Sequence, residues 1–305
     1  MTKINICLCT FKRPKLLTIC LESLRDIIVP PNITVTVTVI DNDKNHSAET
    51  IVDKFREAFP FNIYYYCETK RGIPCARNCA IHATLSLKSD YLVFIDDDEW
   101  VESLWLNHLY AYCKEQGGEI IVSGNVISEL PDKTPEHIRC LFNKKQRDTG
   151  SQLDSCATNN VLIPIHVVGT LGLRFDETNP FSGGEDTRFF YEAAKAGVVI
   201  KKCAEALVHE TVPVSRTTLT WLSKRKFAVG TTVAWRKMQG GRTRLSIVLS
   251  SVSVMIFALL NSFFMILIGN KLSRNKSWLK VCRSFGVLSG VFGVSVDSYR
   301  KVDGG

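Results

Sequence analysis

The chain has 305 residues, of which 45% are apolar and 22% are charged, which excludes a chain too polar to bury a core. Its net charge of +8 is uneven, since residues from 201 onward carry +13 and the first 200 carry −5. A basic excess of this kind suits nucleic acid or an anionic membrane surface as a partner.

Strand and helix patterns alternate through the first 130 residues. Strands are expected at 4–11, 33–43, 62–68, 91–99 and 119–130, and helices at 13–27, 48–59, 73–87 and 103–116. This rhythm predicts an α/β domain with a mostly parallel central sheet and helices on both faces. Ligands of such sheets bind at the carboxyl ends of the strands, so Thr10, Asp41 and the acids from Asp96 onward are expected to meet there.

Four consecutive acids, Asp96, Asp97, Asp98 and Glu99, follow the apolar strand YLVFI. They repel one another unless a positive group lies beside them. An extended backbone places Asp96 and Asp98 on one side and Asp97 on the other. Carboxylates suit Mg²⁺ or Mn²⁺, which is usually held by one or two of them together with substrate phosphates. We therefore predict a metal site at Asp96 and Asp98; the alternative is a solvated acidic turn.

Two further segments carry charges that suit a phosphate or a reacting hydroxyl. In KRGIPCARN (70–78), Arg71 and Arg77 could meet phosphates near a helix start, or could be surface charges. In GGEDTRFF, Glu185 and Asp186 stand at a predicted helix N-terminus, where the dipole favours their charged forms. Asp186 fits a general base, and the alternative is an ordinary N-terminal charge pattern. Asp41 could accept a hydrogen bond from a nucleobase or ribose, but taken alone it is better explained by an Asx-turn.

The later elements are less regular. A strand is expected at 156–164, a helix from Glu185 onward and one or two strands at 198–213. Residues 131–155 are polar and turn-rich and are expected to form a mobile loop.

The C-terminal part is predicted to be membrane-associated. No charged residue occurs between Arg244 and Lys271, and this stretch exceeds the ~20 residues that a spanning helix needs. We expect a catalytic domain at 1–230, followed at 231–305 by a basic linker and a membrane-associated segment with an apolar helix at 245–269. A buried core helix is the alternative. A shorter apolar stretch at 285–296 cannot span, so a single span and a monotopic hairpin both fit.

The sequence does not suggest a secreted protein. Lys12 interrupts the first apolar run too early for a signal peptide, and the 11 cysteines are scattered, as expected for reduced thiols in the cytosol. Basic residues that bracket a long apolar run suit lipid better than nucleic acid, so no nucleic-acid partner is expected.

In chain order, the segments CTFKRP, VIDND, GIPCARN, FIDDDEW, TNNVL and GGEDTRFF resemble the inverting family 2 glycosyltransferases with a GT-A fold, over roughly residues 3–230. DDDE, GGEDT and HETVPVSR are similar to bacterial exopolysaccharide glucosyltransferases of the succinoglycan type. The resemblance implies a nucleotide-sugar donor, most often UDP-linked, and a sugar acceptor that is often carried on a polyprenyl diphosphate.

The resemblance also implies roles for individual residues. Asp186 would be the catalytic base, with Glu185 positioning it or the acceptor. Asp98 would bind the metal, and Asp96 would contact the ribose or the donor sugar. Donor binding would involve Thr10, Arg13, Asp41, Arg71, Asp96 and Asp97, with support from Arg77 and Asn78. Asn159 and Asn160 would line the donor-sugar or acceptor pocket.

Toward the C-terminal side of the resemblance, the role of one residue stays open and one family motif is missing. His209 could be a third metal ligand, although Glu210 and Arg216 match the motif better. The Gln-x-x-Arg-Trp motif of processive synthases is absent, which favours transfer of a single sugar. These features predict an enzyme at the cytoplasmic face of the inner membrane. The alternatives are a non-catalytic membrane-bound nucleotide-sugar-binding protein and a nucleotidyltransferase, although CTFKRP lacks the glycine-rich loop of the latter.

Overall fold

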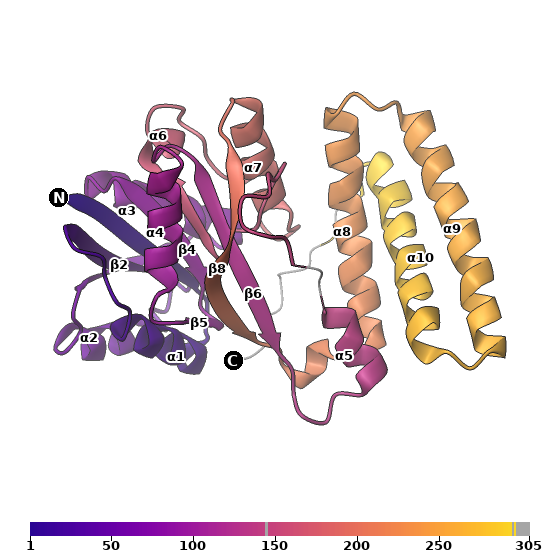
Figure 1. Ribbon diagram of the computed structural model, residues 1–305, viewed down its shortest axis with the longest axis horizontal. Coiled ribbons are helices and arrows are strands. Elements are labelled where there is room, and N and C mark those ends of the chain that lie inside the picture. The colour runs from indigo at the N-terminus through magenta and orange to yellow at the C-terminus, as the bar shows by residue number, and fades with distance from the viewer. Residues whose placement is uncertain (144–145, 295, 297–305) are drawn as a thin grey trace.

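A computed structural model describes residues 1–143, 146–294 and 296, and shows an α/β lobe beside a layer of three long helices (Figure 1). The strands are β1 (Thr2–Thr10), β2 (Ile33–Asp41), β3 (Asn62–Cys67), β4 (Tyr91–Asp96), β5 (Glu99–Val101), β6 (Ile121–Glu129), β7 (Val161–Pro164) and β8 (Ile200–Thr211). The helices are α1 (Pro14–Arg25), α2 (Glu49–Arg56), α3 (Ile73–Ser86), α4 (Trp105–Glu115), α5 (Glu136–Phe142), α6 (Ile165–Val168), α7 (Glu185–Lys195), the 3₁₀ turn η1 (Val214–Arg216), α8 (Leu219–Gln239), α9 (Arg244–Leu267) and α10 (Lys271–Val291).

The eight strands form one sheet in the order β3-β2-β1-β4-β7-β6-β8-β5. The N-terminal half is parallel throughout, as predicted: β1 pairs with β2 and β4, and β2 with β3. The other half is mixed, because β7 runs antiparallel to both β4 and β6, and β5 runs antiparallel to β8. The sheet is therefore less parallel than the sequence suggested, since a long excursion rather than a crossover helix leads from β6 into β7.

Side-chain alternation along the strands divides the core into two layers. Ile4, Ile6 and Leu8 of β1 are fully buried against the layer that contains α1, α2 and α4. Cys7 points the other way, into the layer that contains α3, α6 and α7. Helices thus cover both faces, as predicted, and the carboxyl ends of β1, β2 and β4 lie side by side at one edge of the sheet.

The segment expected to be a mobile loop, 131–155, contains α5. Ile138 is 5% exposed and packs in one cluster with Leu222 of α8 and Leu279 of α10. A helix of seven residues has too little periodicity to be recognised by itself, and its apolar face is explained only by these distant partners. It ties the α/β lobe to the helical layer.

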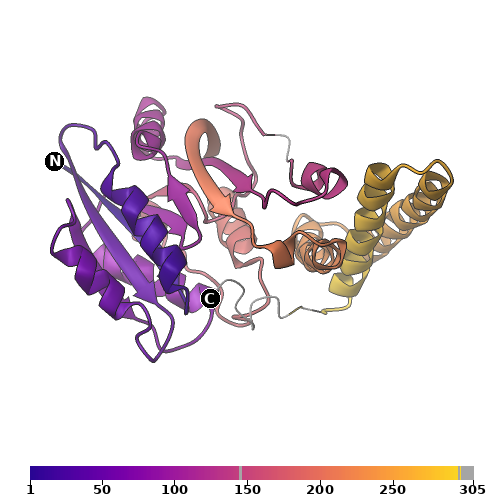
Figure 2. The same cartoon turned by 90° about the horizontal axis from the view of Figure 1, so that it is seen from below.

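The helical layer begins at Leu219, so residue 230, the expected domain border, falls inside α8. The predicted apolar helix matches α9, and residues 285–291 of the glycine-rich stretch belong to the end of α10. Helix α10 lies between α8 and α9 (Figures 1 and 2). It approaches α8 closely, because a Cβ on Gly286 would lie 2.0 Å from the Phe227 carbonyl oxygen and one on Gly230 2.3 Å from the Arg283 carbonyl oxygen.

Substitution Gly286→Ala is expected to lower the free energy of unfolding by about 1–3 kcal/mol, because a methyl group cannot enter this contact without separating α8 from α10. Denaturant unfolding in detergent measures the effect. Gly240→Ala is the control, since a Cβ there comes no closer than 3.5 Å to a neighbour. Equal stability of both variants would contradict the close packing of these helices.

Candidate active site

Three predicted residues meet at the open edge of the sheet. Thr10, Asp41 and Asp96 are the last residues of β1, β2 and β4, and Thr10 pairs in register with Asp41 while Cys9 pairs with Asp96. Parallel strands bring their carboxyl ends to one edge, which explains the convergence.

Arginine side chains neutralise the acidic run that follows β4. Arg13, which precedes Pro14 at the start of α1, places Nη1 2.9 Å from Asp97 Oδ1 and 3.3 Å from Asp98 Oδ2. Arg216 of η1 places Nη1 3.7 Å from Asp98 Oδ2 and 3.6 Å from Glu210 Oε1. The acids are therefore tolerated at this strand exit because guanidinium groups from two distant segments surround them.

Several side chains that were predicted to bind the nucleotide-sugar donor instead form hydrogen bonds within the protein. The Thr10 hydroxyl donates to Asp97 Oδ2 at 2.7 Å, and both residues are less than 5% exposed. Asp41 is fully buried and accepts hydrogen bonds from the Ala48 amide at 2.7 Å and the Tyr65 hydroxyl at 3.1 Å. The Asx-turn alternative therefore describes Asp41: its carboxylate closes the loop after β2. The side chains of Thr10, Asp41 and Asp97 therefore support the site through hydrogen bonds within the protein, and they do not point unpaired atoms toward a nucleotide-sugar.

Burial raises the pKa of two of these acids. It raises the pKa of Asp97 to about 6, although the Arg13 charge and the bonds from Thr10 and Arg13 oppose it. Glu99 is 1% exposed, and burial together with the charge of Asp96 raises its pKa well above the usual range. Its carboxylate accepts from the Asp96 amide at 3.0 Å and from Asn159 Nδ2 at 2.9 Å.

A pH dependence of stability follows from Asp97. Because its folded pKa of about 6 exceeds the ordinary aspartate value of 3.8, the native state holds this proton more tightly than the unfolded chain does. Stability from this group is present at pH below about 4 and is lost as the pH rises toward about 6. Denaturant unfolding of the ligand-free protein should show Asp97→Asn removing this part of the slope, while Asp26→Asn, at a side chain 80% exposed, leaves it unchanged. An unaltered slope in Asp97→Asn would contradict the assignment.

The second acidic group lies at the N-terminus of α7. Gly183 and Gly184 both have positive φ, and a Cβ on Gly184 would lie 2.5 Å from Thr232 Oγ1 of α8. This tight turn delivers Glu185 and Asp186 to the helix start, where the dipole favours negative charge.

Arg77 of α3 joins the two acidic groups. Its Nη1 donates to Glu185 Oε1 in a short ion pair, and its Nη2 lies 4.0 Å from Asp96 Oδ1. The Arg77 side chain is 9% exposed, and its guanidinium lies 5.5 Å from the centre of the Phe175 ring. Asp96, from the acidic run, and Glu185, at the start of α7, therefore lie beside the same cation.

Asp186 has the environment of a base. Burial raises its pKa, as does the charge of Glu185, whereas Arg77, the Thr187 amide and Arg225 lower it. The Thr187 amide donates to Asp186 Oδ1 at 2.6 Å. Arg225 of α8 was not singled out in the sequence, because nothing in SKRKF distinguishes it from a surface cation.

Asn160 and Arg71, two further residues predicted for the site, differ in their surroundings. Asn160 is 1% exposed, accepts from Trp105 Nε1 and donates to the Asn125 and Ala206 carbonyls, all at 2.8 Å. Its amide is fully used in holding α4, β6 and β8 together, so its expected role in acceptor binding is wrong. Arg71 is exposed and stacks 4.2 Å over the Phe11 ring, at the rim of the site.

The structure also shows what Asn78 and His209 contact. Asn78 supports the site by bonding both the amide and the carbonyl of Phe175 at 2.9 Å. His209 is held by Glu129 at 3.0 Å and Glu102 at 3.3 Å and pairs with Trp100, whereas its neighbour Glu210 pairs with Glu99. Since adjacent strand residues face opposite ways, His209 points away from the acidic run, which argues against a role as a third metal ligand.

The fold and this site define a GT-A glycosyltransferase: an acidic run follows β4, an acid pair begins α7, and Arg77 contacts one acid of each group. The sequence profile of glycosyl transferase family 2 matches residues 5–166, and the chain belongs to this family.

A particular relative is the succinoglycan biosynthesis protein ExoM of Rhizobium meliloti (strain 1021), which is 32% identical over 302 residues, covering 95% of this chain and 93% of ExoM. Among solved structures, S. aureus TarS 1–349 matches with a TM-score of 0.55 at 13% identity, covering 93% of this chain and 91% of that one. The complex of TarS 1–349 with UDP-GlcNAc matches with a TM-score of 0.56. The predicted family and fold are thus confirmed.

Proposed function

We propose that the enzyme transfers a single sugar, with inversion, from a UDP-sugar to a hydroxyl of a lipid-linked glycan during synthesis of a cell-surface polysaccharide. The observation that carries the proposal is the Arg77 bridge, which brings Asp96 within 4.0 Å of the guanidinium that pairs with Glu185. This edge of the sheet would then offer one side to the diphosphate of the donor and another side to the catalytic base. The relationship to ExoM supports a polysaccharide product, and the TarS complexes support a UDP-linked donor.

In this mechanism Asp186 removes the proton of the acceptor hydroxyl as that oxygen attacks the anomeric carbon. The bond from the anomeric carbon to the diphosphate oxygen breaks, and its electron pair leaves with the diphosphate. Attack from the face opposite the leaving group inverts the centre. Glu185 stays paired with Arg77 and fixes the start of α7, so that Asp186 is aimed at the acceptor.

The residues present also fit a divalent cation shared with the substrate. The part of the chain described by the structure contains no group of three His, Cys, Asp or Glu side chains placed to hold a metal. Mg²⁺ and Mn²⁺, however, commonly need only one or two carboxylates when substrate phosphates complete the shell. Asp96 and Asp98 would hold such an ion, which would stabilise negative charge on the leaving diphosphate.

The proposed location is the cytoplasmic face of the membrane. Residues 219–294 contain 12 Lys and Arg and no Asp or Glu, and α9 is apolar along its length. Lys and Arg side chains near an anionic bilayer stabilise binding by about 1 kcal/mol each. Such a surface would hold the catalytic lobe near a lipid-linked acceptor while the donor arrives from the cytosol.

The proposal is tested by incubating the purified enzyme with UDP-, GDP- and dTDP-sugars, Mn²⁺ and lipid-linked acceptors extracted from bacterial membranes. Transfer from a UDP-sugar to the lipid fraction is the expected result. Transfer only from another class of nucleotide would refute the donor assignment, and the absence of turnover with every donor would refute the function.

Asp98→Asn should weaken Mn²⁺-dependent UDP binding at least tenfold, because one carboxylate of the proposed ion site is lost. Calorimetric titration of UDP with and without Mn²⁺ measures this. Asp26→Asn, at an exposed acid of the same lobe, is the control. Equal UDP affinity in the wild type with and without Mn²⁺ would remove the metal from the proposal.

A further inference from the structure

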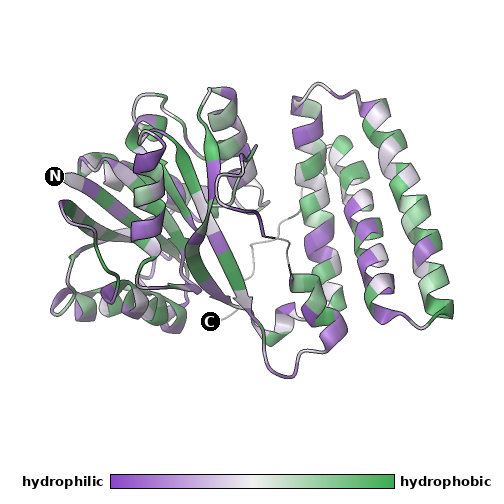
Figure 3. Ribbon diagram, in the orientation of Figure 1, coloured by the Kyte–Doolittle hydropathy of each residue, from purple (hydrophilic) through white to green (hydrophobic). Residues whose placement is uncertain are grey.

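Helix α9 leaves a large apolar surface without a partner. Within the described part of the chain it is the one helix long and apolar enough to cross a bilayer, and only 22% of its most apolar 18-residue stretch is buried. It packs mainly on α10 through a stripe that includes Ile247 and Ala258, while Phe257 and Leu267 are 75% and 71% exposed. Figure 3 shows hydrophobic residues along its outer side. A surface of this size indicates a binding partner.

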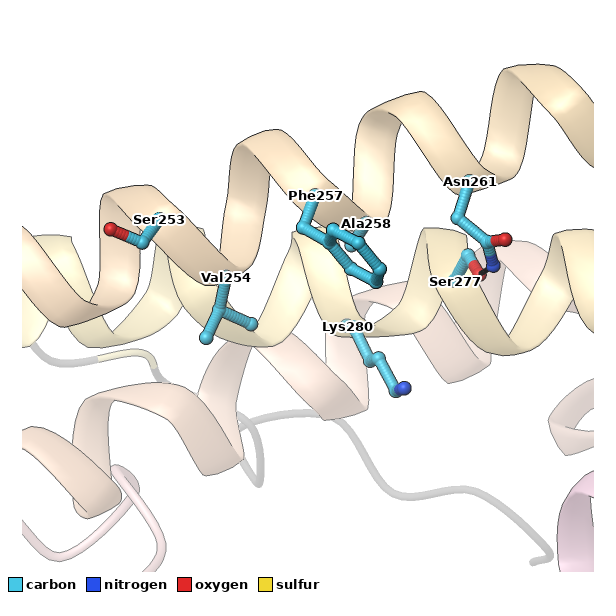
Figure 4. Close-up of a pocket in the computed structure, with 7 residues that line it drawn as sticks. All are labelled: Ser253, Val254, Phe257, Ala258, Asn261, Ser277 and Lys280. Carbon is cyan, nitrogen blue, oxygen red and sulfur yellow. Dashed lines mark hydrogen bonds between the residues drawn. The ribbon is translucent and has the colours of Figure 1, made fainter.

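The pairing of α9 with α10 places positive charge beside the middle of α9. The two helices form an antiparallel hairpin in which Asn261 Nδ2 donates to Ser277 Oγ at 2.6 Å. One turn further along α10, Lys280 borders the same groove as Val254 and Ala258, close to the midpoint of α9 (Figure 4). The groove has a volume of about 380 Å³, near the low end for ligand sites, so it suits a segment of one acyl chain rather than a whole carrier lipid.

This register argues against a transmembrane α9. If α9 crossed the bilayer with α10 beside it, Lys280 would lie near the hydrocarbon centre and Arg283 one turn away. Both residues are exposed, and no acid occurs anywhere in residues 219–294 that could neutralise them within the layer. Charged side chains at the bilayer centre are costly and are normally paired or turned into a bundle interior.

The two faces of α10 instead suit the border between lipid and water. Lys276, Lys280 and Arg283 share one face by their i, i+4, i+7 spacing. Trp278 and Phe285 lie seven residues apart on another face, where they contact α8 and still remain 41% and 57% exposed. Long cationic side chains can reach headgroups from an apolar surface, and aromatic rings prefer this depth.

We infer that α9 lies in the plane of the membrane interface, with its apolar side among the acyl chains of an anionic bilayer and the α10 cations at the phosphates. This inference rests on the proposed membrane location and decides between the span and the monotopic hairpin. Both ends of α9 then stay on the side of the catalytic lobe.

Cysteine labelling tests the inference. Single cysteines are introduced as Ser246→Cys, near the start of α9, and Ser273→Cys, just beyond its end, in the full-length protein bound to sealed phosphatidylglycerol liposomes. A membrane-impermeant maleimide added outside is expected to label both sites equally before and after permeabilisation, above the background of the unmodified protein. Labelling of Ser273→Cys only after permeabilisation would show a span and overturn the inference. Failure to float with the liposomes, with elution as a dimer, would show that a second copy covers α9 and would also overturn it.

A charge substitution gives an independent result. Lys280→Gln should weaken binding to phosphatidylglycerol liposomes about fivefold, because one headgroup contact is lost. A spanning α9 would respond in the opposite sense, since removing a charge from the bilayer centre favours insertion. Lys15→Gln, in α1 of the α/β lobe, is the control and should leave binding unchanged. UDP-sugar turnover measured in detergent on the same samples reports on the proposed function separately.

Discussion

Asp186→Asn is expected to lower sugar transfer about 10²- to 10⁴-fold while UDP affinity stays at the wild-type level. The amide has nearly the shape of the carboxylate and can still accept the Thr187 amide hydrogen bond, but it cannot take a proton from the acceptor. Steady-state transfer and calorimetric UDP binding, measured on the same preparation, separate the two effects.

Glu192→Gln is the matched control for this variant. It removes an acid two turns further along α7, where the side chain is 46% exposed and remote from Arg77. It should transfer sugar at the wild-type rate. Wild-type turnover in Asp186→Asn would refute its assignment as the base, and loss of UDP binding would assign it to the donor instead.

Arg77→Met is expected to destabilise the protein by about 3–5 kcal/mol and to abolish transfer, because it leaves the buried Glu185 without its cation. The melting temperature measures the first effect. Arg77→Lys keeps the charge but loses the guanidinium fork that reaches Glu185 and Asp96 together, so an intermediate stability is expected. Arg77 also lowers the pKa of Asp186, so the acid limb of kcat/KM in Arg77→Lys should move to higher pH if the shorter cation lies farther away.

Arg188→Met provides the comparison, since Arg188 on α7 pairs with Asp176 with both side chains at least 30% exposed. Exposed pairs contribute at most about 1 kcal/mol, so this variant should melt close to the wild type. If Arg77→Met were equally stable, the bridge between the two acidic groups would have no energetic importance.

The main features of the fold and site could be predicted because they depend on local patterns. Period-two strands and helices at 3.6-residue spacing alternate up to β4, and parallel strands necessarily share a carboxyl edge. The meeting of Asp96 with the Glu185 and Asp186 pair was expected from the family resemblance. In the structure, Arg77 pairs with Glu185 and lies 4.0 Å from Asp96.

The remaining features depend on contacts between residues far apart in the chain. Asn160 was expected at the acceptor because it stands in the TNN motif, but its partners Trp105 and Ala206 lie 55 and 46 residues away and bury it. The acidic run was expected to require a metal ion; in the structure its positive neighbours include Arg13 and Arg216, which come from opposite ends of the catalytic lobe. No local periodicity indicates such pairings.

The most direct test is a crystal structure of the enzyme with UDP and Mn²⁺. It should show the diphosphate and the ion at Asp98, with Arg13 or Arg216 moved onto the phosphates. Asp186 should face the space beside the diphosphate that the donor sugar would occupy. Nucleotide bound on another surface, or Asp186 separated from the diphosphate by the body of the protein, would contradict a single site for donor and acceptor.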